Sequence, residues 1–293
     1  MKIKKAIIPI LNNDLEFLPI TKEVPKEMMT VIDKPVIQFV LDELIKSDVT
    51  DILVISNNPK SYLINEYFKR NYVLENYLKE NNKYGALNVL KGVNRIPSFL
   101  TLDLSSESTL GDMLYKAKGF IGDDPFFLVI PDFVCLGNNT SLIQLNNEFE
   151  KKRATIIGTM DLKKENNSDY FRVFPFGPVI NNKEFEIHDF EEKGIVDKID
   201  IAYGSIGRFA FTNTIIKILE EESYEIDLGL SFSKALNRLI DIEKVYGNNV
   251  DCLKYYVGLE KGFVEMVIDY ALNKDELKYD VKKMILEKVS QRN

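Results

Sequence analysis

Short apolar runs rich in β-branched residues recur through the first half of the chain, and they constrain its fold more than any other feature. These runs occupy residues 5–11, 51–56, 126–131 and 154–160. Runs of this length without polar alternation are typical of strands that are buried on both faces of a parallel sheet. Between the first two runs, the apolar residues of segment 35–47 fall on one helical face. The pattern therefore predicts an α/β fold, with a Rossmann-like, mixed and mostly parallel central sheet flanked by helices.

The rest of the chain predicts further helices, one returning strand and a three-part organisation. Helical patterns lie at 59–67, 72–92, 214–221 and 228–239 and again after residue 258, and 207–212 predicts a strand. Turn signals between 163 and 204 predict an accessory hairpin region. We therefore expect one α/β domain over residues 1–272, which includes the hairpin region, followed by a C-terminal helical arm over 273–293.

Composition argues against several classes of protein. The 293 residues carry a net charge of −7, which argues against a general binder of nucleic acid or of an anionic membrane. No apolar run reaches the roughly 18 residues of a membrane-spanning helix. Cys135 and Cys252 have no zinc-site spacing, so we expect two buried free thiols in a reducing compartment. These features predict a cytoplasmic protein.

Five segments, in this order, resemble the bacterial UTP–glucose-1-phosphate uridylyltransferase family. The segments are "FLPITKEVPKEMMTVIDKPVIQ" (17–38), "LGDMLYKAKGFIGDDPFFLVIPD" (110–132), "FEEKG" (190–194), "SIGRFAFTNTIIKIL" (205–219) and "DYALNKDEL" (269–277). The resemblance implies a sugar nucleotidyltransferase fold. It also implies a reaction in which glucose-1-phosphate attacks the α-phosphate of UTP, giving UDP-glucose and pyrophosphate, with Mg²⁺ as cofactor.

The resemblance assigns roles to residues that match the family motifs. Lys26 matches the lysine that contacts phosphate, and Asp132 matches the aspartate that holds Mg²⁺, so these two are the candidate catalytic residues. Glu192 and Lys193 match a pair at the sugar and its phosphate, and Gly207 lies where the family chain passes close to the sugar. These three residues are therefore candidate substrate-binding positions.

Other family positions are changed in this chain. The family's G-L-G-T-R loop is replaced by residues 12–16, which include Asn12, Asp14 and Glu16 and contain no glycine. Glycine lets backbone amides approach a phosphate closely, and arginine attracts it, whereas Asp14 and Glu16 repel it. The position expected for a second metal-binding aspartate is Leu230. A single remaining carboxylate holds Mg²⁺ weakly unless substrate phosphates complete the coordination.

The predicted uracil side is also altered. The family's G-L-G-H stretch is Thr109, Leu110, Gly111 and Asp112 here, so Gly111 is the one glycine that remains and is a further candidate substrate-binding position. The glutamine that the family uses to contact the base corresponds to Leu104 or to a neighbouring serine. A site that loses such a hydrogen-bonding group loses much of its discrimination.

Three functional hypotheses follow. The first is a catalytically impaired or inactive homologue with a dismantled triphosphate site, which binds a sugar phosphate or UDP-sugar and acts as a regulatory paralogue. The second is a working UTP–glucose-1-phosphate uridylyltransferase, or a related sugar nucleotidyltransferase, with an atypical site and Mg²⁺. The third is a structural subunit in an oligomer with an active homologue. In each case we expect no nucleic-acid or membrane partner, and a homo-oligomer, such as a dimer, that could also include an active homologue.

Overall fold

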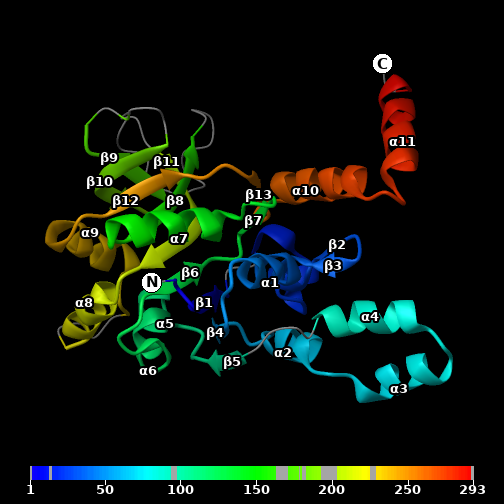
Figure 1. Cartoon of the computed structure of the whole chain (residues 1–293), viewed down its shortest axis with the longest axis horizontal. Coiled ribbons are helices and arrows are strands. Elements are labelled where there is room, and N and C mark those ends of the chain that lie inside the picture. Colours follow the sequence, from blue (N-terminus) through cyan, green and yellow to red (C-terminus); the bar gives the residue numbers. More distant parts are fainter. Residues whose placement is uncertain are drawn as a thin grey trace.

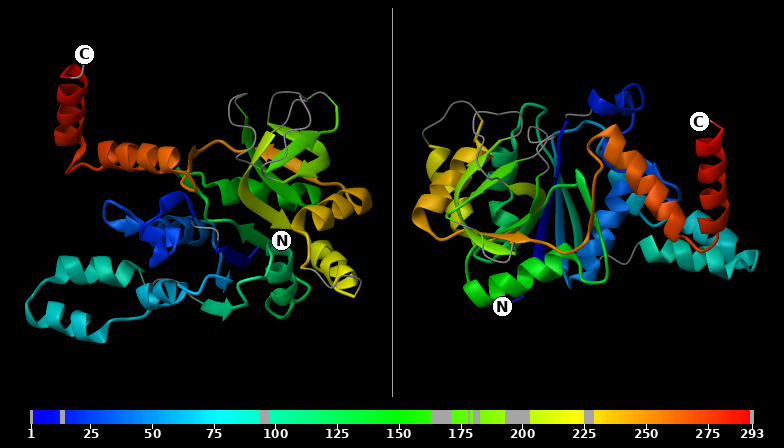
Figure 2. Two further views of the ribbon diagram at one scale, coloured as in Figure 1. Left: turned by 180° about the vertical axis from the view of Figure 1, so that it is seen from behind. Right: turned by 90° about the horizontal axis from the view of Figure 1, so that it is seen from above.

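The computed structural model describes residues 2–12, 15–93, 98–162, 171–177, 179, 183–192, 203–224 and 229–291. Its centre is a nine-stranded sheet in the order β5-β4-β1-β6-β11-β8-β12-β10-β9 (Figure 1). Figure 2 shows helices on both faces of this sheet. The predicted mixed α/β architecture is therefore confirmed.

Four parallel strands form one half of the sheet: β5 (Ser98–Asp103), β4 (Asp51–Ser56), β1 (Lys5–Ile10) and β6 (Phe126–Val129). Three of them coincide with predicted apolar runs. Parallel strands end at the same edge, so the segments that follow β1, β4 and β6 lie near one another.

The other half of the sheet mixes strand directions. It contains β11 (Tyr203–Phe211), β8 (Ile156–Asp161), β12 (Tyr246–Asn249), β10 (Glu184–Glu191) and β9 (Arg172–Pro175). Only β10 and β11 run against the other seven of the nine strands. The start of β11 also pairs with β9, so this end of the sheet curls back on itself. The described part of the predicted hairpin region is thus β9 and β10.

Two apolar clusters fill the spaces between the sheet and its helices. The cluster on one face contains Ile8 and includes α1 (Val36–Lys46) and α7 (Ser141–Lys152). The cluster on the other face contains Ile7 and includes α5 (Leu110–Lys116), α8 (Thr214–Glu222) and α9 (Phe232–Ile242). Neighbouring residues of β1 point to opposite faces, because side chains alternate along a strand.

Smaller elements lie around this core. They are η1 (Leu15–Phe17), η2 (Ile20–Lys22), η3 (Lys26–Met28), β2 (Thr30–Val31), β3 (Lys34–Pro35), α2 (Tyr62–Phe68), α3 (Tyr72–Glu80), α4 (Tyr84–Val93), α6 (Lys118–Ile121), β7 (Phe133–Leu136), β13 (Leu253–Tyr256), α10 (Glu260–Asn273) and α11 (Lys278–Ser290). The α3–α4 pair and the α10–α11 arm lie on the side of the molecule away from β9 and β10 (Figure 1).

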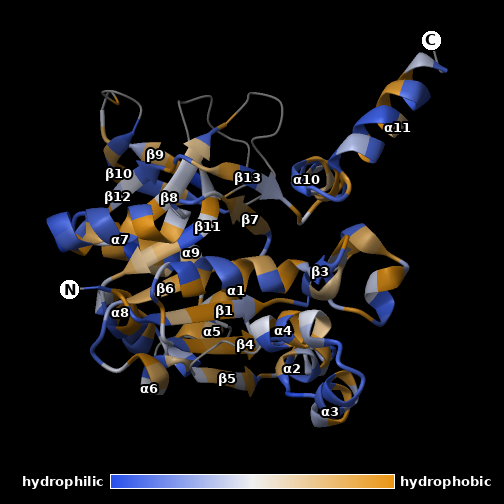
Figure 3. Ribbon diagram, turned by 45° about the vertical axis from the view of Figure 1, so that its right-hand side comes forward, coloured by the Kyte–Doolittle hydropathy of each residue, from blue (hydrophilic) through white to orange (hydrophobic). Residues whose placement is uncertain are grey.

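The C-terminal arm differs from the rest of the chain in its packing. Helix α11 has no buried residue, and Figure 3 shows polar and apolar residues mixed along it, whereas β1 and β4 are mostly apolar. Helix α10 ends at Asn273, close to the predicted start of the arm, but the boundary at 272 itself stays a prediction. No helix in the described ranges is both long and apolar enough to cross a bilayer.

A buried ion pair joins the two halves of the sheet to α1. Arg208 of β11 is fully buried, and its Nη2 lies 2.9 Å from Oε2 of Glu43 in α1. The same guanidinium donates hydrogen bonds to the carbonyl oxygens of Ile130 and Phe133, each at 2.9 Å, and Ser141 of α7 donates to Glu43. Burial alone would lower the pKa of Arg208, but the Glu43 carboxylate raises it above its usual value, so the guanidinium stays charged.

This network predicts a large effect of Arg208→Met on stability. The substitution leaves the Glu43 carboxylate buried without its counter-charge, which costs about 3–5 kcal/mol of unfolding free energy in other buried pairs. Urea denaturation followed by circular dichroism measures the loss. Lys118→Met is the control, because it breaks the exposed 2.8 Å pair with Glu220 and should leave the unfolding midpoint nearly unchanged. Similar losses in both variants would contradict the role assigned to Arg208.

Candidate functional site

The candidate site begins where β1, β4 and β6 end. The residues that follow these strands are Leu11 and Asn12, Asn57 and Asn58, and the segment that contains Asp132. In open α/β sheets, ligands bind outside the carboxyl ends of the strands. The sequence predicted this edge, and the structure brings the loops after β1 and β4 into contact.

Asn57 makes that contact. The backbone N–H of Asn12 donates to Oδ1 of Asn57 at 2.7 Å, and Nδ2 of Asn57 donates to the carbonyl oxygen of Ser108 at 2.7 Å. This side chain therefore ties the loop after β1 to the segment that leads into α5. The sequence analysis missed Asn57, although a polar residue directly after a buried strand was a usable signal. Of the predicted altered loop, Asn12 and Glu16 are both exposed, while Asp14 lies outside the described residues.

The two candidate catalytic residues lie together. Nζ of Lys26, at the start of η3, is 2.7 Å from Oδ1 of Asp132, which follows β6. Both side chains are about nine-tenths buried, with exposed fractions of 11% and 9%. The space that they line with Val36 and Val257 is too narrow for a bound molecule. A ligand that enters this space would therefore have to open the ion pair.

The segment beside Asp132 comes from the C-terminal part of the chain. Strand β13 pairs with β7 in a register that sets Tyr256 opposite Phe133, and their rings are 4.8 Å apart. The backbone N–H of Gly258 donates to the carbonyl oxygen of Asp132 at 3.2 Å. Residues 256–258 are thus the neighbours of the candidate metal residue.

Leu230, which the resemblance matches to the family's second metal position, lies in the apolar core. Its side chain is 4% exposed and belongs to the apolar cluster with α5, α8 and α9. Its backbone N–H donates to Oδ1 of Asp112 at 3.0 Å, and its carbonyl oxygen accepts from the Thr109 hydroxyl at 2.7 Å. Leu230 therefore completes the packing at the start of α5, and its match to the family's second metal position stays a prediction.

The same contact with Leu230 explains why position 111 is glycine. A Cβ at this position would lie 2.2 Å from the Leu230 carbonyl oxygen, so only glycine fits. Thr109 and Asp112 form a capping box around it, in which the Thr109 hydroxyl accepts from the Asp112 amide and the Asp112 carboxylate accepts from the Thr109 amide. The altered T-L-G-D stretch is therefore accounted for by helix capping and packing.

Gly207 is likewise explained by the protein's own backbone. Its φ of +65° favours glycine, and an added Cβ would lie 2.9 Å from Cβ of Ile130. The strand register of β11 against β8 shifts between Ser205 and Phe209, which places Gly207 within an irregular stretch. A substrate-binding role for Gly111 or Gly207 stays a prediction.

The predicted sugar-side pair is only partly described. Glu192 follows β10, and its Oε1 accepts a hydrogen bond from the Ser233 hydroxyl of α9 at 2.6 Å. Lys193 lies outside the described residues. The contact joins the predicted sugar side to α9, whose start lies next to Leu230 in the chain.

The described side chains offer few ligands for a metal ion. Within the described ranges, no three His, Cys, Asp or Glu side chains gather closely enough to hold a metal ion. Asp132 offers a carboxylate, the ligand type that Mg²⁺ prefers, but Lys26 already contacts it. These donors alone do not make a protein-built Mg²⁺ site.

The fold and this edge define a nucleotidyltransferase. The sequence profile described as nucleotidyl transferase matches residues 16–248. The chain is 28% identical over 277 residues to the UTP–glucose-1-phosphate uridylyltransferase of Bacillus subtilis strain 168, covering 94% of each chain. It is 30% identical over 290 residues to the Streptococcus pyogenes protein of that name, covering 98% of this chain and 94% of the relative. The chain therefore belongs to the nucleotidyl transferase family, among the UTP–glucose-1-phosphate uridylyltransferases.

Solved structures agree on the fold. The UTP-bound UGPase from Acinetobacter baumannii matches 97% of this chain, and 99% of its own length, with a TM-score of 0.87 and 24% identity. A structure of apo UDP-glucose pyrophosphorylase matches 92% of this chain and 98% of its own length, with a TM-score of 0.79 and 25% identity.

The Lys26–Asp132 pair predicts energetic coupling between these two residues. Lys26→Met and Asp132→Asn should each lower the unfolding free energy by about 2 kcal/mol, because each leaves a mostly buried group without its counter-charge. The double variant should lose at least about 1 kcal/mol less than the sum of the two. Urea unfolding of the four proteins measures this difference, and strictly additive losses would contradict the pairing.

Proposed function

We propose that this chain binds a sugar phosphate or UDP-sugar at the carboxyl edge of its sheet, is catalytically impaired in UDP-glucose synthesis, and acts as a regulatory paralogue. The observation that carries the proposal is the Lys26–Asp132 pair. The lysine matched to phosphate binding and the acid matched to metal binding lie 2.7 Å apart and offset each other. A triphosphate site needs both charges available to the substrate.

The charge of the neighbouring loop supports the same conclusion. Glu16 stands where the family has an arginine, and no glycine occurs in 12–16. Two like charges about 4 Å apart repel by about 1 kcal/mol in water and by several-fold more at a partly desolvated site. UTP carries more negative charge than a sugar monophosphate, so this loop opposes the nucleotide more strongly. Lys26, once released from Asp132, would supply a cation for the smaller anion.

A working enzyme with an atypical site is the second candidate. The 30% identity over 98% of the chain and the retained Lys26 and Asp132 favour it. In that case Asp132, released from Lys26, would hold Mg²⁺ together with substrate phosphates, and the ion would neutralise developing charge on them. Lys26 would then orient a phosphate group of the substrate.

A structural role in an oligomer is the third candidate. Helix α11 has 13 residues and none of them is buried, so this helix has surface available for a partner. We expect such a partner to be a second copy of this chain or an active homologue. We also expect the protein to work in the cytoplasm.

Turnover tests the proposal. Pyrophosphate release from UTP and glucose-1-phosphate, with Mg²⁺ present, is measured beside the Bacillus subtilis relative under the same conditions. Loss of one preorganised charge contact commonly costs about 10²–10³ in rate, so we expect release at least about a hundredfold slower than in the relative. Release at a comparable rate would select the second candidate.

Restoring the loop is expected to be insufficient. The triple variant Asn12→Gly, Asp14→Gly and Glu16→Arg should still release pyrophosphate at least about tenfold more slowly than the relative, because catalytic groups that act as a unit do not contribute additively. Glu23→Arg, at an exposed position of the same segment, controls for an added positive charge. Recovery to the relative's rate by the triple variant alone would show that the other changes are harmless.

A further inference from the structure

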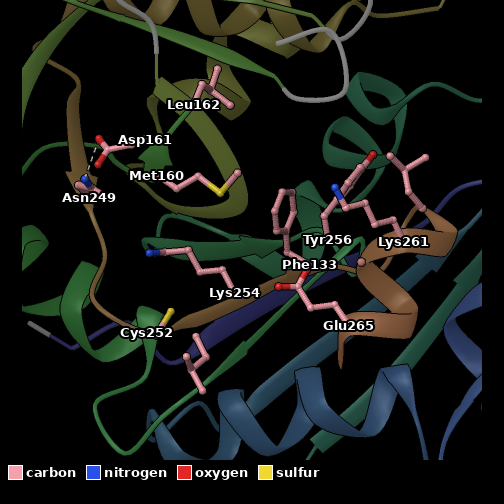
Figure 4. Close-up of a pocket in the computed structure, with 13 residues that line it drawn as sticks. Phe133, Met160, Asp161, Leu162, Asn249, Cys252, Lys254, Tyr256, Lys261 and Glu265 are labelled. Atoms are coloured by element: carbon pink, nitrogen blue, oxygen red, sulfur yellow. Dashed lines mark hydrogen bonds between the residues drawn. The ribbon is translucent and has the colours of Figure 1, made fainter. Parts of the chain in front are cut away.

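A second cavity lies beside the candidate site and has no role in the function proposed above. Its volume is about 520 Å³, within the range of roughly 300–1,000 Å³ found for small-molecule sites. The ends of β8 and β12 form one side of it, and β13 and the start of α10 form the other (Figure 4).

The charged and amide groups of this cavity come from four elements. Lys254 of β13 and Lys261 of α10 line it, and neither ammonium has an ion pair within the described part of the chain. Asp161 at the end of β8 accepts a hydrogen bond from Nδ2 of Asn249 at 3.2 Å, and Glu265 lies one turn after Lys261. In Figure 4, the Lys254 side chain extends toward the side of the pocket where Asn249 lies. The cavity is therefore lined by two cations, two carboxylates and an amide, with Lys254 extended toward Asn249 and with Lys261 and Glu265 together on α10.

The start of α10 adds hydrogen-bond donors beside Lys261. Its N-cap residue is Leu259, whose side chain cannot accept a hydrogen bond, so the first amides of this 14-residue helix have no side-chain cap. The positive end of a helix dipole favours an anion. Leu259, Lys261 and Gly262 all line the cavity.

We propose that this cavity binds a hydroxylated phosphate monoester of about the size of a hexose phosphate. Lys254 and Lys261 contact the phosphate group, while Asp161 and Asn249 accept and donate hydrogen bonds to hydroxyl groups. A phosphate alone would leave Asp161 and Asn249 unused, and an uncharged sugar would leave the two lysines unused.

The cavity adjoins the segment that carries Asp132. Phe133 lines the cavity and directly follows Asp132, and Tyr256 lines it and packs on the Phe133 ring. A ligand in the cavity would therefore contact β7 and β13, the two strands next to Asp132. Lys26 is not among the residues that line the cavity.

Cys252 provides a local reporter of occupancy. It lines the cavity, is partly exposed, and has a pKa lowered by its hydrogen bond with Cys135. Cys135 is 5% exposed, and that hydrogen bond together with burial raises the pKa of its thiol. Iodoacetamide should therefore alkylate Cys252 in preference to Cys135.

The test measures the rate of Cys252 alkylation by mass spectrometry in the full chain with increasing glucose 6-phosphate. We expect the ligand to slow alkylation. Lys254→Gln and Lys261→Gln should each raise the concentration needed for half-protection at least about tenfold, because each removes a charge-assisted hydrogen bond. Lys217→Gln, at an exposed lysine of α8, is the matched control and should leave protection unchanged.

One further variant and two further ligands separate this site from the one that contains Lys26. Protection should persist in Lys26→Gln, whatever the outcome of the turnover assay. Glucose or inorganic phosphate at the same concentration should protect less than the phosphate ester. No protection, equal protection by glucose, or protection lost in Lys26→Gln but kept in Lys254→Gln and Lys261→Gln would overturn the proposal.

Discussion

The buried pair between Arg208 and Glu43 is the interaction on which the rest of the structure depends. A fully buried guanidinium is costly to desolvate and is tolerated only when its hydrogen bonds are well made. Here it joins β11 to α1 and also binds the carbonyl oxygens of Ile130 and Phe133. Those two residues flank the Pro131–Asp132 turn. These buried hydrogen bonds therefore fix the position of Asp132, the candidate metal residue.

The candidate site is built on this support, and we propose that the arrangement of its charges no longer suits a triphosphate. Lys26 and Asp132 pair with each other, and the loop after β1 carries acids and no glycine. The start of α5 is occupied by the Leu230 backbone. A preserved scaffold with a changed phosphate-facing surface is consistent with binding of a smaller anion. The lysine-lined cavity behind Phe133 is a separate place where such an anion fits.

Much of the fold could be predicted from the sequence, because apolar periodicity reports directly on burial. Segment 51–56 became β4 with the same bounds, and 35–47 contains α1. Helix α9 begins at Phe232 instead of 228, because Ser231 caps it by accepting a hydrogen bond from the Lys234 amide. A serine at this position is a recognisable capping signal in the sequence, but the helical pattern alone does not locate the first residue of a helix.

The site was less predictable, because its contacts join distant parts of the chain. Lys26 and Asp132 were identified separately, and nothing in their local sequence shows that they meet. Leu230 was matched to a metal position by motif spacing, yet its burial and its contacts with Thr109 and Asp112 depend on the packing of α5 against the α8–α9 layer. The neighbours of Asp132 come from residues 256–258, which are more than 120 positions away along the chain.

The central claim is that the phosphate-facing edge now favours a small sugar phosphate over a nucleoside triphosphate. Titration calorimetry of the unmodified chain with glucose-1-phosphate and, separately, with UTP and Mg²⁺ tests it most directly. The account predicts heat of binding for glucose-1-phosphate that falls in Lys26→Gln, where only the cavity behind Phe133 still binds it, and UTP binding weaker by at least about tenfold. Micromolar binding of UTP with Mg²⁺, tighter than that of glucose-1-phosphate, would contradict it.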